Sequence, residues 1–152
     1  HSETTEFTQQ PTNAYQALVD AQESGVIPFD ITFAGFGNLA GLDGNYVEKS
    51  SLKVNYRLGD LGVQLSGLRK GDFYQSSETR SDGTRYVIPS MTTYNASVYY
   101  WFNVGDNKAR VKLAVQNLED ERAPLADRFY GFFADAHQDY GRRFYLDVKV
   151  KF

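Results

Sequence analysis

Residues 143–152, Arg-Phe-Tyr-Leu-Asp-Val-Lys-Val-Lys-Phe, decide the fold because apolar and polar side chains alternate along them without a break. Successive side chains of a β-strand point to opposite faces of its sheet, so a period of two predicts a strand with one apolar and one polar face. The apolar face consists of Phe144, Leu146, Val148, Val150 and Phe152. This segment therefore predicts a final strand over residues 141–152.

The same alternation occurs in four earlier segments, so the second half of the chain is predicted to be a run of antiparallel strands. The predicted strands cover residues 46–58, 61–75, 91–102, 108–120 and 141–152. Gly-containing tight turns at 58–61 and 103–107 alternate with long polar loops at 76–89 and 121–140. Alternating short and long connections are typical of outer-membrane barrels, in which the short turns lie in the periplasm.

Composition favours the same class. The chain has eleven Tyr, eleven Phe and one Trp, yet its mean hydropathy is −0.49. A composition that is rich in aromatic residues but hydrophilic overall is typical of a transmembrane β-barrel, because only alternate residues face lipid. No run approaches the roughly 20 apolar residues of a transmembrane helix. A soluble β-sandwich also alternates, but its strands are commonly about 5–6 residues, shorter than these.

The first 45 residues are less regular and are predicted to be an extracellular loop with a possible partial strand. Residues 12–24 fit a short helix or a loop, and residues 27–34 fit a strand. The net charge of −3 and the lack of a basic block argue against nucleic acid as a partner. With zero Cys, disulfides and thiolate metal sites are excluded.

A sequence motif links the last two predicted strands. Asn117-Leu118-Glu119-Asp120 ends the penultimate strand, and Gly141-Arg142 precedes the last one. This order resembles the end of TonB-dependent outer-membrane receptors, although Glu119 occupies a position that is more often Phe in that family. Residues 52–57 and 93–96 also resemble strands of that region, so the resemblance covers roughly residues 46–152.

The resemblance implies a fold and partners. The fold expected is all-β, with the chain supplying the last five or six antiparallel transmembrane strands of a larger, 22-stranded barrel. Five strands cannot close a barrel, and an open sheet edge in lipid leaves unpaired backbone groups. The expected partners are therefore the remaining N-terminal strands and plug of the same receptor. The inner-membrane TonB complex, the barrel-assembly machinery, outer-membrane lipid and lipopolysaccharide complete the expected set.

The implied function is TonB-dependent active uptake of a scarce nutrient, such as a siderophore, oligosaccharide or peptide, at the bacterial outer membrane. A passive porin remains an alternative, as does a soluble β-sandwich binding module. The five outward residues Phe144 to Phe152 resemble the signal that the barrel-assembly machinery recognises by strand addition. An enzyme is not expected, because no nucleophile motif accompanies either of the two His residues. No cofactor is expected.

The loop 121–140 is the predicted place of ligand contact, since it mixes rings with charges. The candidate substrate-binding residues are Arg128, Tyr130, Phe132, Asp135 and His137. Alternatively, the aromatic residues pack the loop against its neighbours. A lone His beside one Asp is a weak metal motif, so no metal site is predicted. The predicted lumen face carries Lys53, Arg57, Arg110, Lys112, Arg143, Asp147, Lys149 and Lys151.

Overall fold

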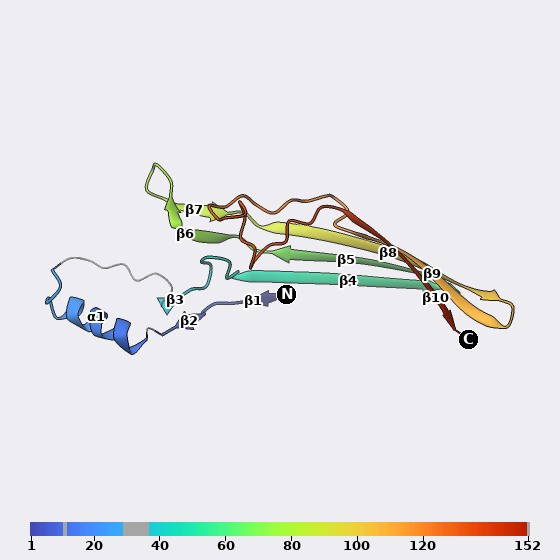
Figure 1. The fold of residues 1–152 in the computed structure, drawn as a ribbon, viewed down its shortest axis with the longest axis horizontal. Coiled ribbons are helices and arrows are strands. Elements are labelled where there is room, and N and C mark those ends of the chain that lie inside the picture. Colours follow the sequence, from blue (N-terminus) through green and yellow to red (C-terminus); the bar gives the residue numbers. More distant parts are fainter. Residues whose placement is uncertain (11, 29–36, 152) are drawn as a thin grey trace.

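The structure, a computed structural model, describes residues 1–10, 12–28 and 37–151. Its main element is one antiparallel sheet with strand order β1-β4-β5-β8-β9-β10 (Figure 1). These strands are β1 (Ser2–Glu3), β4 (Glu48–Leu58), β5 (Leu61–Lys70), β8 (Met91–Val104), β9 (Asn107–Gln116) and β10 (Arg143–Lys151). Two small sheets pair β2 (Thr8–Gln9) with β3 (Gly37–Asn38) and β6 (Phe73–Thr79) with β7 (Arg85–Ile88). The predicted all-β class is confirmed, with one short helix, α1 (Asn13–Glu23), added.

Several boundaries differ from the predicted ones. The predicted strand 61–75 ends at Lys70, and the chain starts a separate hairpin, β6–β7, where a polar loop was expected. The predicted strand 108–120 ends at Gln116, because Asn117 adopts a φ of 55°, outside the extended region. In the first 45 residues, the helical alternative for 12–24 matches α1. Most of the segment 27–34 and Phe152 lie outside the described residues.

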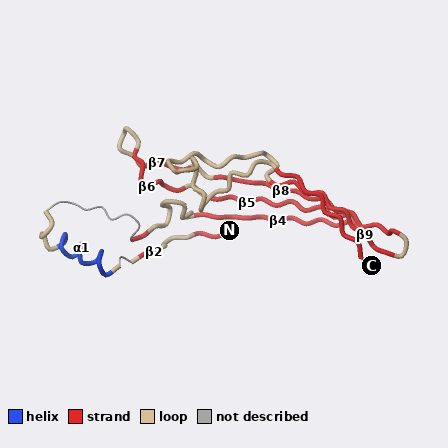
Figure 2. Tube along the Cα trace, in the orientation of Figure 1, coloured by secondary structure: helices blue, strands red, loops and turns tan. Residues whose placement is uncertain are grey.

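The two tight turns share one design. In each, a two-residue Gly-Asp loop joins neighbouring strands, with φ of 58° at Gly59 and 59° at Gly105. Glycine in the first central position is the requirement of a type II′ hairpin turn, whose twist matches that of the strands. Figure 2 shows both turns at one end of the sheet, whereas the β6–β7 hairpin and the long loops gather at the other end. That second end is called the loop end below.

One face of the sheet is apolar across five strands. The strand register aligns the apolar residues of each strand in rows that cross the sheet. Three complete rows are Val54-Leu65-Ala96-Val115-Phe144, Tyr56-Val63-Val98-Leu113-Leu146 and Leu58-Leu61-Tyr100-Val111-Val148. No described element covers this face: Leu113 is 54% exposed and Leu146 68% exposed. A β-sandwich would bury such a face against a second sheet.

The opposite face is polar and carries the predicted charges. Gly62 lies under the Tyr99 ring, and a Cβ at this glycine would be 2.1 Å from the Tyr99 Cζ. The tyrosine ring therefore covers the strand where the glycine leaves it bare. Trp101 also lies on this face, opposite Arg110 in the register, and not beside Tyr100 and Phe102 on the apolar face.

A small hydrophobic cluster stands at the loop end of the sheet. Phe73 and Ile88 of the β6–β7 hairpin pack against Phe133 and Ala136 of the loop that leads to β10, and all four are buried. Tyr46, just before β4, contacts Phe73 with ring centroids 5.8 Å apart. The long loops are thus packed on one another. Of the described helices, none is long and apolar enough to cross a membrane.

Candidate ligand-binding site

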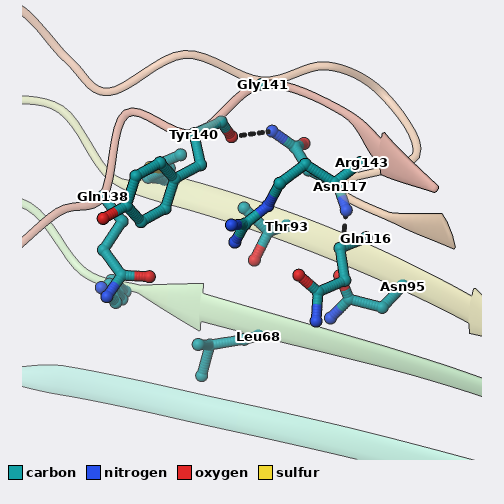
Figure 3. Close-up of a pocket in the computed structure, with 11 residues that line it drawn as sticks. Leu68, Thr93, Asn95, Gln116, Asn117, Gln138, Tyr140, Gly141 and Arg143 are labelled. Atoms are coloured by element: carbon teal, nitrogen blue, oxygen red, sulfur yellow. Dashed lines mark hydrogen bonds between the residues drawn. The ribbon is translucent and has the colours of Figure 1, made fainter. Parts of the chain in front are cut away.

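A polar cavity of about 240 Å³ lies on the polar face at the loop end of the sheet (Figure 3). Its walls come from four neighbouring strands, β5, β8, β9 and β10, and from the loop that precedes β10. The lining residues are Leu68, Lys70, Met91, Thr93, Asn95, Gln116, Asn117, Gln138, Tyr140, Gly141 and Arg143. Since side chains alternate between the two faces along each strand, the ends of β5, β8 and β9 contribute their last residues of the polar face to one space.

The cavity lining suits a polar, electron-rich ligand. It contains the cations Lys70 and Arg143 but neither Asp nor Glu. The Arg143 guanidinium lies over the Tyr140 ring, 4.5 Å from the centroid, which holds its donors toward the cavity (Figure 3). The Lys70 ammonium donates to the carbonyl oxygen of Ala136 at 2.5 Å. Together with the amides of the lining, these groups offer many hydrogen-bond donors.

The Asn117 side chain holds the cavity wall together. Its Nδ2 donates to the carbonyl oxygens of Glu121 at 2.8 Å and Tyr140 at 3.1 Å, and its Oδ1 accepts from the Glu121 N–H at 2.9 Å. The Asn117 N–H donates to Asn95 Oδ1 at 2.9 Å. Asparagine tolerates the positive φ found here better than most residues. One side chain therefore joins the end of β9 to the approach to β10.

Asp120 makes the second link of the motif. Its Oδ1 accepts the Arg142 N–H at 2.6 Å, at the point where the chain enters β10. A Cβ at Gly141 would lie 2.8 Å from this oxygen, so glycine permits the close approach. Residues 117–120 and residues 141–142 are thus joined into one structural unit, although they are far apart in the sequence. This unit positions Arg143 at the cavity.

An ion pair closes the base of the loop 121–140. Arg122 donates to both carboxylate oxygens of Asp139, at 2.8 and 2.5 Å, and the Ala123 N–H donates to the same carboxylate at 2.9 Å. These hydrogen bonds to the ionised form lower the pKa of Asp139 to about 2. The loop therefore has a fixed base at neutral pH.

The five predicted ligand residues separate into different environments. His137 is 1% exposed and stacks on Phe73 with centroids 5.8 Å apart, so it belongs to the buried cluster and does not face solvent. Arg128 lies over the Phe133 ring at 4.4 Å and is 3.8 Å from Asp43. Asp135 is exposed, and Tyr130 is 69% exposed. The alternative of loop packing therefore applies to His137.

An exposed aromatic tip remains available for contact. Phe129 is 94% exposed and meets Tyr130 edge to face with centroids 5.0 Å apart, and Tyr130 lies 6.3 Å from Phe132. Two rings that face solvent at a loop tip are typical of a contact surface. The predicted residues missed the cavity itself, except that Arg143 was placed on the lumen face. The cavity could have been predicted from the sequence, because alternation places Thr93, Asn95, Gln116 and Arg143 on the same polar face, each near the end of its strand.

Acidification is expected to loosen the buried cluster around His137. Burial and the nearby Lys70 charge lower the pKa of His137 from 6.5 to about 4, and neither ring nitrogen has a hydrogen-bond partner among the described residues. Between these pH values the unfolded chain binds a proton that the folded chain does not. Stability present in full above pH 6.5 is therefore lost as the pH falls toward 4. After correction for the slower intrinsic exchange in acid, the protection of the β6 amides against hydrogen exchange should fall over this range.

The matched variant is His137→Phe, which keeps a ring against Phe73 but cannot bind a proton. It should lose the dependence between pH 6.5 and 4 while keeping that of Asp139, whose contribution is lost only as the pH falls toward 2. Glu78, whose pKa is raised through its hydrogen bond to Asp127, is present in both proteins and cancels in the comparison. Identical pH profiles would show that His137 does not control the cluster.

Neither a metal centre nor a cation pair formed by Arg69 and Lys70 is found among the described residues. In the described parts of the chain, no three His, Cys, Asp or Glu residues lie close enough together to hold a metal ion. Arg69 and Lys70, adjacent in sequence at the loop end, point to opposite faces of β5, so only Arg69 lies on the apolar side. Comparison with protein-family models, curated proteins and solved structures finds no match to this chain.

Proposed function

We propose that this chain forms part of the membrane-spanning barrel of a TonB-dependent receptor, which takes up a scarce nutrient such as a siderophore, oligosaccharide or peptide across the bacterial outer membrane. The observation that carries the proposal is the uncovered apolar face, continuous over five strands. Burying a large apolar side chain stabilises a protein by about 1.5–3 kcal/mol. Such a face requires either a covering layer or lipid.

The dimensions of the face suit lipid. On β8 the side chains of the apolar face begin at Tyr94 and end at Val104, so the apolar part of this strand is eleven residues long. At about 3.3 Å per residue and a tilt of about 40°, they rise roughly 25 Å, the height of the apolar band of outer-membrane barrels. A transmembrane strand needs about 9–11 residues. The stacked rings of Tyr100 and Phe102 lie near the tight turns, where aromatic girdles meet headgroups.

The two sheet edges support a larger barrel. β1 pairs with β4 only at Glu48 and Lys49, so the rest of the outer edge of β4 has no partner among the described residues. The outer edge of β10 is likewise unpaired in the described part of the chain. Inside a bilayer such edges are tolerated only when neighbouring strands complete them. The remaining strands of the receptor supply these neighbours in the proposal.

Uptake is supported by what the polar face carries. The cavity at the loop end has two cations and amides, and the exposed aromatic tip stands in a loop at the same end. In the proposed orientation both face the outside, where ligand is captured, and the tight turns face the periplasm. A plug in the barrel, acted on by the inner-membrane TonB complex, couples binding to uptake. Without a plug the same lumen is a passive pore, and energy-independent uptake would favour that alternative.

Lipid contact can be tested with adjacent cysteines, because the chain has none of its own. Leu52→Cys lies on the apolar face and is 70% exposed, whereas Lys53→Cys lies on the polar face of the same strand. In the receptor reconstituted in bilayers, a fluorophore on the first thiol should be quenched by spin-labelled lipids. A fluorophore on the second should instead be quenched by aqueous iodide. Equal quenching of both by iodide would refute the barrel.

A further inference from the structure

The two cations of the cavity at the loop end have no acidic partner. Among the described residues, no carboxylate forms an ion pair with the Lys70 ammonium or with the Arg143 guanidinium. Lys49 lies directly opposite Lys70 in the strand register, and like charges in this position repel each other. Positive charge that the protein leaves unbalanced in a hollow attracts an anion.

The amides of the cavity wall present donors to the ligand. The side-chain oxygen of Asn95 accepts the Asn117 N–H at 2.9 Å, and that of Gln116 accepts the Tyr145 hydroxyl at 3.0 Å. Both oxygens are therefore engaged within the protein, whereas the two amino groups have no acceptor in the described part of the chain. An amide NH₂ group donates hydrogen bonds, so these free positions favour a ligand that is rich in acceptors.

Arg143 is held in a position to bind an anion. Its guanidinium lies over two tyrosine rings, 4.5 Å from the centroid of Tyr140 and 6.0 Å from that of Tyr145. Figure 3 shows it pointing into the cavity. The rings restrict the guanidinium without accepting conventional hydrogen bonds from it, so its N–H groups stay available. Their fixed fork matches the two oxygens of a carboxylate or phosphate.

The size of the cavity limits what it holds. Its volume of about 240 Å³ is below the roughly 300–1,000 Å³ of pockets that enclose a whole drug-sized ligand. It therefore holds one group or one ring of a larger ligand. Thr93 and Gln138 also line it, and their hydroxyl and amide can bond to uncharged polar groups beside the anion.

We propose that the cavity binds an acidic group of the ligand, a carboxylate or a phosphate, with Arg143 making the bidentate contact and Lys70 supplying the second charge. The inference rests on the proposed function, in which this cavity faces the outside, and it names the class of nutrient. That class is an acidic solute, such as a sugar acid or a sugar phosphate, and not a neutral oligosaccharide. A neutral hydroxyl leaves the charge of the cavity unbalanced, whereas an ionised carboxylate is acceptor-only and balances it.

Acetylation of Lys70 by acetic anhydride measures occupancy of the cavity in the full receptor, extracted from the outer membrane in detergent. The probes are D-galacturonate, D-galactose phosphate and D-galactose, which share one sugar ring and differ in charge. We expect at least one of the acidic probes at millimolar concentration to slow the acetylation of Lys70 about fivefold, followed by mass spectrometry. D-galactose should leave the rate unchanged. Lys53, an exposed residue on the same face outside the cavity, is the internal reference.

Two arginine variants form a matched pair. Arg143→Gln should raise the concentration of acidic probe that gives half-protection about tenfold, and Arg143→Lys should raise it less, because lysine keeps the charge but loses the fork. Arg142→Gln removes the same charge one residue earlier, and its side chain does not line the cavity, so protection should be intact. Heat-modifiable migration on gels shows that each variant is folded.

The remaining outcomes decide between the alternatives. Equal protection by D-galactose and by the acidic probes would overturn the proposal, because the cavity would then recognise hydroxyl groups and not charge. Equal protection of Lys53, or no protection of Lys70 by either acidic probe, would also overturn it. Protection by one acidic probe alone supports the proposal and identifies the acid as carboxylate or phosphate. The lipid quenching at Leu52→Cys is read separately, so loss of the barrel assignment is distinguishable from loss of the acid site.

Discussion

If the proposed barrel is correct, Val54→Arg is expected to prevent stable assembly of this protein in the outer membrane. Val54 lies within the apolar face and its side chain is 51% exposed in the sheet, so arginine causes no steric clash. In the proposed barrel its cost comes from placing a charge against lipid, about 2–4 kcal/mol at the midplane. The measurement is the fraction of the protein that is folded and heat-modifiable in isolated outer membranes.

Asn55→Arg is the matched control. Asn55 is the next residue of β4, is also exposed and points to the polar face, where Arg57 already lies. If the apolar face contacts lipid, the folded fraction should be far lower for Val54→Arg than for Asn55→Arg, and that of Asn55→Arg should be close to that of the unaltered protein. In a sheet surrounded by water, both positions would accept arginine equally. Equal yields of the two variants would therefore contradict membrane insertion of the apolar face.

Asn117→Ala is expected to lower the free energy of unfolding by about 4–5 kcal/mol. The change removes three side-chain hydrogen bonds of a residue that is only 7% exposed, each worth about 1 kcal/mol. It also places alanine at a φ of 55°, which adds about 1–2 kcal/mol for a residue with a Cβ. Urea titration of the folded protein, followed by gel migration, measures the loss of stability.

Asn117→Gly separates the two causes. Glycine adopts the positive φ without strain but makes none of the side-chain hydrogen bonds. This variant should therefore be more stable than Asn117→Ala and less stable than the unaltered protein, with faster proteolysis of the loop 121–140 in both. If Asn117→Ala unfolds at the same urea concentration as the unaltered protein, the hydrogen bonds to Glu121 and Tyr140 do not hold the end of β9 to β10.

Different parts of the sheet suit different kinds of contact. The apolar face suits lipid, and the cavity beside Arg143 suits a polar ligand. The Asn117 and Asp120 contacts connect these parts, because they fix where β10 starts and hence where Arg143 points. The same strand then carries Lys149 and Lys151 to the opposite end of the sheet.

Local pattern was enough to predict the strands and their faces. Alternation alone placed Phe144, Leu146, Val148 and Val150 on one face and Arg143, Asp147, Lys149 and Lys151 on the other, and the register keeps that division across five strands. The reason is that the period of two is a property of each strand by itself. The two Gly-Asp turns could also be predicted from the sequence, because a two-residue hairpin turn needs glycine at a defined position.

Tertiary contacts decided the rest. The hairpin β6–β7 was missed because its residues 73–79 and 85–88 gain their order from Phe133 and Ala136, more than 40 residues away. His137 resembled an exposed ligand in sequence, but packing against Phe73 buries it. The cavity forms because four strand ends and Tyr140 meet in space, which no local period encodes. Sequence thus determined which side of each strand is apolar, and the fold determined which distant side chains meet.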